Sequence, residues 1–210
     1  MNWSWLHRPL ESPSIYRAVQ NFLGAGGRSL DDVFERGFGG ACGLVLDVGS
    51  GPVRETPLPN GTLVGFDINP RYVLRYATAG STSQCDLFGV VGTAAAMPFS
   101  TGTFDECGSV AVLHHLPDPL AADTAREMLR VLKPGGRLSV FDMVRPERFG
   151  DGPLASFLCA IDRGRHLRTR TALGELLREA CPGPWSEDPV VYAWPRLHGV
   201  LFMLHKPAQR

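Results

Sequence analysis

Two glycines and two acids stand at the ends of two short apolar runs, in a pattern that suits a ribose-bearing cofactor. "LDVGSG" (46–51) places Gly49 and Gly51 directly after the first run, and Asp67 ends the second run, "TLVGFD", twenty positions after Asp47. Glycines in such a turn let the backbone approach a ligand without a Cβ in the way. An acid about 20 residues on accepts hydrogen bonds from both ribose hydroxyls. The alternative is that Asp67 merely caps a helix that begins near Asn69.

The chain departs from this pattern soon after the turn. A third glycine is expected two positions after Gly51, but the residue there is Val53. Pro57 and Pro59 then interrupt the helix that normally follows, because proline removes a backbone donor and clashes with the preceding turn. The sequence therefore predicts a shortened connector, with the first turn of the loop kept.

Alternating apolar runs and helical patterns predict the elements that position these residues. Strands are expected over 44–48, 62–67, 87–91, 104–113 and 137–144. Helices are expected over 12–23, near 29–38, over 69–77, over 118–136 up to the Pro-Gly-Gly stop, and over 154–163 and 171–180. "VVYAWP" (190–195) and "HGVLFMLHK" (198–206) close the chain as an antiparallel hairpin. This order predicts a Rossmann-like three-layer α/β sandwich around a mainly parallel seven-stranded sheet.

Composition favours a small-molecule partner. The 21 basic and 21 acidic side chains cancel, which gives no general field for nucleic acid or an anionic membrane. No run approaches the roughly 20 apolar residues of a membrane span, and the N-terminus has no signal-peptide core, so a cytoplasmic protein is expected. Five cysteines without CxxC and six histidines without HxxxH predict reduced thiols and no bound metal. The sequence does not indicate an oligomeric state.

Further motifs carry a family resemblance. The runs "AAAMPFSTGTFDECGSVAVLHHLPDP" (94–119) and "EMLRVLKPGGRLSVFD" (127–142) follow "LDVGSG" and the acid at 67 in order. Together they resemble the class I S-adenosylmethionine-dependent methyltransferases, in particular the branch that includes the quinone-biosynthesis methyltransferases, with this chain as a compact member. The resemblance covers about residues 44 to 144. It disfavours an NAD-dependent oxidoreductase, in which "VLKPGG" and "LHHLPDP" have no role.

The resemblance implies a single domain and assigns its parts. Residues 1–40 would form an N-terminal helical cap, 44–144 the cofactor-binding core, 145–185 an acceptor-side insert and 186–210 the terminal hairpin. The residues that would hold S-adenosylmethionine line its methionyl and ribose side (Asp47, Gly49, Ser50, Gly51), its ribose (Asp67), its adenine (Ile68, Thr93, Ala94, Met97) and its methionine tail (Ser109, Val110). Asp105, at the start of the fourth strand, is expected to be structural.

Thr93 is the position at which the chain departs from the family's pattern around the adenine. The family has an acid in "GDAxxLPF", where it accepts a hydrogen bond from the adenine amino group, whereas this chain reads "GTAAAMPF". The loss of a hydrogen bond to a charged acceptor costs roughly 1.5–3 kcal/mol, which is about ten- to a hundredfold in affinity. A threonine hydroxyl still accepts one bond and Met97 offers adaptable packing. We therefore expect weakened cofactor binding.

The expected reaction is methyl transfer to a small molecule, with an oxygen or nitrogen acceptor preferred to carbon and S-adenosylhomocysteine as the second product. His114 and His115 follow the fourth strand, where one of them would act as general base or simply orient the loop. Arg163, Arg165 or Arg168 would hold an anionic acceptor, or else form a solvated helix flank. Tyr16 would contact cofactor or acceptor, or belong to the core. The rivals are a non-methylating use of the same cofactor, such as cyclisation, and a non-catalytic regulatory partner.

Overall fold

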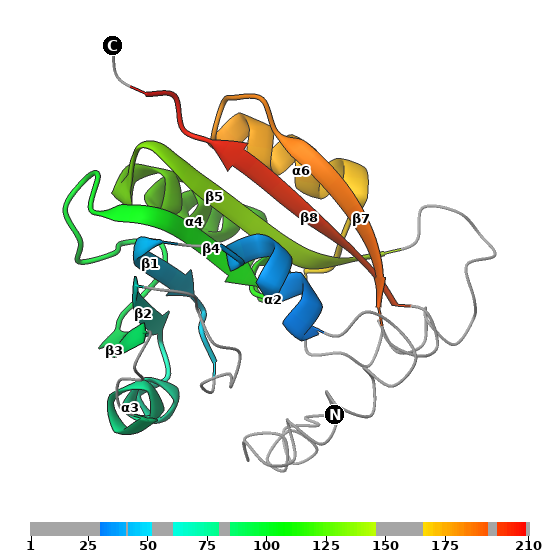
Figure 1. The fold of residues 1–210 in the computed structure, drawn as a ribbon. Helices are drawn as coiled ribbons and strands as arrows, with labels where there is room; N and C mark the ends of the chain where they lie inside the picture. The colour runs from blue at the N-terminus through cyan, green and yellow to red at the C-terminus, as the bar shows by residue number, and fades with distance from the viewer. Residues whose placement is uncertain are drawn as a thin grey trace, which may run out of the picture.

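The computed structural model describes residues 30–40, 42–51, 61–79, 85–145, 166–192 and 197–208, and they build a single twisted sheet with helices on both faces (Figure 1). The sheet has the order β3-β2-β1-β4-β5-β8-β7, and the short strand β6 pairs with β5 outside this order. The strands are β1 (Gly43–Val48), β2 (Gly61–Asp67), β3 (Cys85–Val91), β4 (Phe104–Val110), β5 (Leu132–Arg145), β6 (Arg168–Thr169), β7 (Ser186–Tyr192) and β8 (Leu197–His205). The helices are α2 (Leu30–Phe38), α3 (Pro70–Ala79), the 3-10 turn η3 (Leu113–His115), α4 (Asp118–Val131) and α6 (Arg170–Ala180).

The pairing directions confirm the predicted fold class. The pairings among β1, β2, β3, β4 and β5 are all parallel. β8 pairs antiparallel with both β5 and β7, which makes the two last strands of the chain the expected hairpin. The main sheet has the predicted number of seven strands, and the two residues of β6 are an addition to it.

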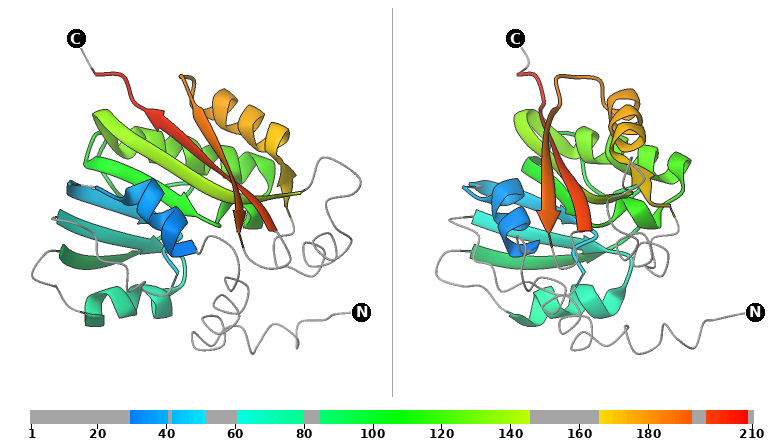
Figure 2. Two further views of the ribbon diagram at one scale, coloured as in Figure 1. Left: turned by 45° about the vertical axis from the view of Figure 1, so that its right-hand side comes forward. Right: turned by 90° about the vertical axis from the view of Figure 1, so that its right-hand side faces the viewer.

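Two apolar clusters fill the two faces of the sheet, so that the sheet is the middle of three layers (Figure 2). On one face α4 and α6 bury Ala121, Ala125, Met128, Leu173 and Leu177 against the strands. On the other face α2 and α3 contribute Val33, Phe38 and Tyr76. In the right-hand view of Figure 2, α2 and α6 lie on opposite sides of the sheet.

Strand order reverses between β1 and β4. The chain leaves β1 toward β2, whereas it leaves β4 toward β5 on the other side. Val48 at the end of β1 pairs with Ser109 near the end of β4, so the two carboxyl ends lie together. In open α/β sheets the crevice at such a point is where ligands bind.

Several predicted boundaries differ from the structure (β7, for example, begins at Ser186 instead of Val190), and local chemistry explains two of them. β4 ends at Val110, three residues early, because Ala111 adopts a left-handed φ of 59° that breaks the strand. α4 ends at Val131 and not at the Pro-Gly-Gly stop, because a residue before proline, here Lys133, favours extended backbone; β5 therefore begins at Leu132. The helices predicted over 12–23 and 154–163 lie outside the described residues.

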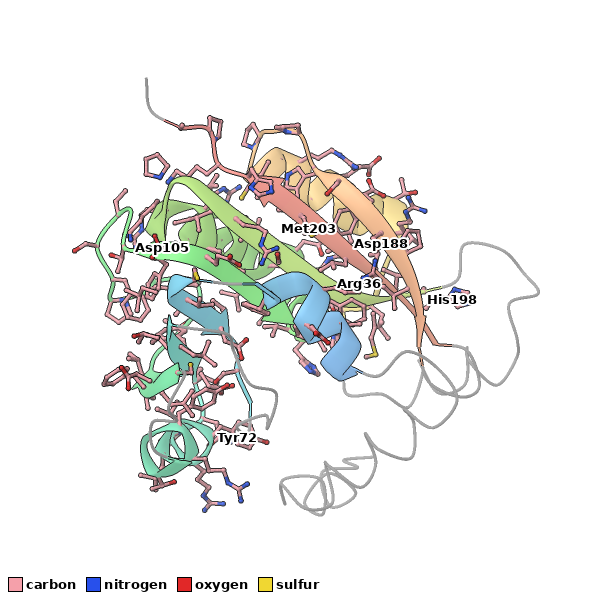
Figure 3. All side chains as sticks on the ribbon, viewed as in Figure 1. Arg36, Tyr72, Asp105, Asp188, His198 and Met203 are labelled. Carbon is pink, nitrogen blue, oxygen red and sulfur yellow. The ribbon has the colours of Figure 1, made fainter. Side chains whose placement is uncertain are left out.

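The amino edge of the sheet carries structural ion pairs. Asp105 accepts hydrogen bonds from the backbone N–H of Leu44 at 2.9 Å and from Lys133 Nζ at 2.7 Å, which confirms its predicted structural role. In Figure 3 Asp105 lies at one end of the sheet, and His198 lies near the other. Away from this edge, Arg36 of α2 forms an ion pair with Asp188 of β7 (Figure 3). Among the described helices, none has the length and apolar character needed to cross a membrane.

Candidate cofactor-binding and active site

The turn after β1 keeps the glycine geometry that the sequence predicts. Gly49 and Gly51 have φ angles of 68° and 59°, a region that side chains rarely adopt. The backbone N–H of Gly49 donates to the carbonyl of Phe66 at 2.7 Å, which ties the turn to β2. A Cβ on Gly49 would lie 2.4 Å from Val112 Cγ2, whereas a Cβ on Gly51 would meet no atom of the described residues within 4 Å. The turn is therefore packed behind Gly49 and open beside Gly51.

Asp67 links this turn to the end of β2. Its Oδ2 accepts from the backbone N–H of Gly51 at 3.0 Å, and its Oδ1 accepts from that of Asn69 at 2.8 Å. The carboxylate therefore does cap the start of α3, as the alternative interpretation held, and also holds the glycine turn. An ionised carboxylate accepts about four hydrogen bonds, so capacity remains at this side chain for two hydroxyl groups of a ligand.

An exposed apolar side chain stands next to the acid. Ile68 is 75% exposed, which is unusual for a large aliphatic side chain, and Val91 at the end of β3 is 51% exposed. Thr93 lies exposed in the loop after β3, and Ala94 is half-buried there. An apolar face beside a ribose-binding acid suits a flat aromatic base. Met97 is 5% exposed and packs into the core under this loop.

Some of the remaining predicted cofactor residues pack in the core. Others line the cofactor cradle, which is formed by the glycine turn after β1, Asp67 and the loop after β3. Asp47 is buried and accepts a hydrogen bond from Tyr76 Oη of α3 at 3.2 Å. Val110 packs into the cluster on the α2 face. Ser50 and Ser109 are 2% and 1% exposed, and within the described part of the chain neither hydroxyl has a hydrogen-bond partner. Buried hydroxyls without a partner are costly, so these two, which lie beside the switch point, are suited to hydrogen-bond a polar ligand.

The residues at this site suit S-adenosylmethionine, the cofactor that the resemblance implies. The open side of Gly51 leaves room for a ligand, the Asp67 carboxylate has capacity for ribose hydroxyls, and Ile68 offers an apolar face. The hydroxyls of Ser50 and Ser109 would meet the methionyl side. Bound there, the cofactor would supply a methyl group already activated by an adjacent sulfonium.

A buried histidine–carboxylate pair lies where β4 and β5 end. His114 and Asp142 are 3% and 1% exposed, and the Nδ1–H of His114 donates to Asp142 Oδ1. Asp142 Oδ2 accepts from the backbone N–H of His114 at 2.8 Å, and Oδ1 accepts from that of Met143 at 2.8 Å. His115 is exposed, and its ring centroid lies 4.0 Å from that of His114. These contacts give His114 the loop-orienting role that the sequence left open, and leave His115 as the exposed ring.

Arg168 has a different role from the one predicted. Its guanidinium donates to the carbonyls of Leu113 and Leu116, each at 2.8 Å, and to Asp118 Oδ1 at 2.7–2.9 Å. The side chain is 8% exposed, and four of the five N–H donors of a guanidinium are engaged in these bonds. Arg168 therefore clamps the 113–116 turn instead of presenting a fork to an anionic acceptor.

Three of the predicted site residues cannot be placed, and one residue of the site was not predicted. Tyr16, Arg163 and Arg165 lie outside the described residues. Asp142 was missed, although "VFD" at the end of β5 repeats the pattern of "GFD" at the end of β2, where Asp67 was found. An acid after an apolar strand was the available signal.

Comparison with known proteins agrees with this site. Residues 46–140 match the family described as "Methyltransferase domain". The chain is 36% identical over 108 residues to 24-methylenesterol C-methyltransferase 2 of Oryza sativa, and 33% identical over 119 residues to demethylmenaquinone methyltransferase of Roseiflexus castenholzii. These matches cover 48% and 52% of the chain. They span 29% and 48% of the relatives, so the chain matches less than half the length of either protein.

Solved structures share the fold. A methyltransferase structure from Bacillus halodurans has a TM-score of 0.59 at 19% identity, covering 79% of this chain and 93% of that one. The [4+2]-cyclase SpnF has a TM-score of 0.64 at 18% identity, covering 86% and 81%. The motifs, the switch-point cradle and the matched family coincide on the same residues. Residues 46–140 of this chain are therefore a methyltransferase domain of the class I type, whose cofactor is S-adenosylmethionine.

Proposed function

We propose that the protein transfers a methyl group from S-adenosylmethionine to a small-molecule acceptor. The observation that carries the proposal is the position of Asp67, whose carboxylate holds the open glycine turn at Gly51 and stands beside the exposed Ile68. These groups are suited to a ribose and a base near the switch point of the sheet. The chain's task is then alignment, because the displacement needs nucleophile and methyl carbon in line at near-contact distance.

His114 and His115 are assigned complementary tasks at the acceptor side. A carboxylate accepts hydrogen bonds, so Asp142 places the proton of a neutral His114 ring on Nδ1 and fixes the orientation of that ring. The exposed His115, whose ring is tilted by 47° to that of His114, is the candidate base for an acceptor that must lose a proton. The buried pair of His114 and Asp142 holds the 113–116 turn and thereby positions His115.

The acceptor atom is the finer part of the proposal. The sequence favours oxygen or nitrogen, whereas the rice relative is named a C-methyltransferase, and that name supports carbon. The likeness to SpnF concerns the fold and leaves cyclisation as the rival use of the same cradle. A product carrying one added methyl, with its new bond located by NMR, decides among the atoms.

Calorimetric titration with S-adenosylmethionine and with S-adenosylhomocysteine tests the proposal at its first step. Both are expected to bind at one site per chain. Incubation with candidate acceptors should then form S-adenosylhomocysteine in a one-to-one ratio with methylated product. Binding without S-adenosylhomocysteine formation during turnover would assign the cyclase-type reaction, and no binding of either molecule would assign a non-catalytic partner.

Thr93→Asp is expected to tighten S-adenosylhomocysteine binding by about tenfold, because an acid there accepts a charge-assisted hydrogen bond from the adenine amino group. Thr93 is exposed, so the new carboxylate is not forced into the core. The measurement is the Kd by calorimetry. The control ligand is the hypoxanthine analogue, in which a carbonyl replaces the amino group, and its Kd should not fall. Equal tightening for both ligands would contradict the placement of the adenine amino group at residue 93.

A further inference from the structure

The loop between β3 and β4 must be held in place, because Thr93 and Ala94 lie on it without belonging to a helix or strand. Its first residue is tied to the cradle, since the backbone N–H of Gly92 donates to the carbonyl of Asp67 at 3.1 Å. A tight turn follows, in which the N–H of Ala96 donates to the carbonyl of Thr93 at 3.1 Å. The next anchor comes from outside the loop.

Two side chains of α4 grip the backbone just beyond this turn. Glu127 Oε2 accepts from the N–H of Met97 at 2.7 Å, and Arg130 Nη2 donates to the carbonyl of the same residue at 3.1 Å. Arg130 Nη1 donates to the carbonyl of Phe99 at 2.8 Å. Glu127 and Arg130 also pair with each other through two bonds of 2.6 and 2.8 Å. One fork and one carboxylate thus hold three backbone groups of the loop.

A second pair on the same helix shows that this arrangement is not simply a helical ion pair. Arg126 and Asp123 have the same three-residue spacing, and Arg126 Nη1 donates to Asp123 Oδ1 at 2.7 Å. Both side chains are more than half exposed, at 51% and 53%. Arg130 and Glu127 are 33% and 19% exposed, because they lie under the loop. Exposed pairs of this kind contribute little to stability.

The charges of Glu127 and Arg130 favour their hydrogen bonds with the backbone of the loop. The hydrogen bond from Arg130 lowers the pKa of the Glu127 carboxyl, and the same bond raises the pKa of Arg130. Glu127 therefore stays ionised at neutral pH and remains a charged acceptor for the Met97 N–H. Charge-assisted bonds to a backbone group are stronger than neutral ones.

A row of aromatic side chains connects the loop to the glycine turn. The ring of Phe99 meets Phe66 and Phe104 edge-on, with centroids 5.5 and 5.0 Å apart. The carbonyl of Phe66 in turn accepts from the N–H groups of Gly49 and Ser50. The loop held by α4 is thus in contact with both sides of the cradle.

We propose that Glu127 and Arg130 are positioning residues for the adenine side of the cofactor. They hold the backbone at Met97 and Phe99, and through it they set the turn that begins at Thr93 against Ile68. Neither side chain is assigned a contact with the cofactor. The inference rests on the proposed function, because it concerns the cradle that would bind S-adenosylmethionine.

Arg130→Lys, with Arg126→Lys as the matched control, tests the proposal. Lysine keeps the charge but lacks the planar fork that reaches two carbonyls and a carboxylate together. The expected result is a Kd for S-adenosylhomocysteine about tenfold weaker in Arg130→Lys, and a Kd within twofold of the wild type in Arg126→Lys. Glu127→Gln keeps an acceptor for the Met97 N–H without its charge, so an intermediate loss is expected.

A coupling measurement separates positioning from general loosening of the fold. Thr93→Asp gains affinity only if residue 93 is correctly placed, so its gain should disappear in the Arg130→Lys background and persist in the Arg126→Lys background. A gain that persists in both backgrounds, or equal Kd values for the two lysine variants, overturns the inference. If the wild type binds no S-adenosylhomocysteine, the proposed function fails instead, so the two failures are distinguishable.

Discussion

Asp67→Ala is expected to weaken the binding of S-adenosylhomocysteine by at least about a hundredfold. A hydrogen bond to a charged acceptor contributes about 1.5–3 kcal/mol, and two ribose hydroxyls lose their acceptor at once. The substitution also releases the N–H of Gly51, which the carboxylate holds at 3.0 Å, so the turn loses its link to β2 at this point. The Kd from calorimetry at constant ionic strength is the measurement.

Asp86→Ala is the control for this prediction. Asp86 is exposed near the amino end of β3, in the strand next to the one that Asp67 ends, and its removal changes the net charge by the same amount. Its Kd should match that of the wild type. A hundredfold loss in both variants would point to a general electrostatic effect, and unchanged binding in Asp67→Ala would remove the ribose from this carboxylate.

Asp142→Ala is expected to lower the free energy of unfolding by about 3 kcal/mol or more, because each buried donor left without its acceptor costs about 1–3 kcal/mol. Three donors lose their acceptor together: the N–H and the Nδ1–H of His114, and the N–H of Met143. With Asp142 1% exposed, water does not readily replace the lost oxygens. Urea unfolding followed by circular dichroism gives the change.

The comparison variant is Asp123→Ala, whose carboxylate is half exposed and paired with Arg126 on the surface of α4. A change below about 1 kcal/mol is expected there. The double variant Asp142→Ala with His114→Ala should be less destabilised than the sum of the single variants, because the two side chains interact directly. Additive losses would show that the histidine and the carboxylate contribute separately.

The fold class could be predicted from the sequence because each strand of the main sheet has its own local signal, whereas the two-residue β6 has none. The runs ending at Val48 and Asp67 are apolar, short and bounded by turn residues, and the structure places them side by side. The end of β4 could not be predicted, because Ala111 has a left-handed φ that only its surroundings impose. Register and crossing of the strands likewise come from packing between distant segments.

Some features of the candidate site could likewise be predicted from the sequence, and others could not. The glycine turn at Gly49 and Gly51 and the place of Asp67 at the end of β2 could be predicted, because backbone geometry and a fixed spacing define them; their contacts with a cofactor stay predictions. Arg168 was misjudged, since a cluster of arginines in sequence does not reveal that one of them is buried against carbonyls 52 and 55 residues away. The contacts of Arg130 with Met97 and Phe99 were missed for the same reason, because they span 33 and 31 residues.

Because Arg168 holds the 113–116 turn, the segment between Arg145 and Arg168 can be replaced by segments of other lengths. β6 pairs with the end of β5 through Val144 with Arg168 and Arg145 with Thr169, so the chain leaves this point after Arg145 and is back at it by Arg168. Since both ends are anchored to the same strand and turn, the length between them has little influence on either anchor. Doubling a loop's length costs only about 0.6 kcal/mol of closure entropy. Segments of other lengths can therefore be grafted between these two anchors without displacing β5, β6 or the 113–116 turn.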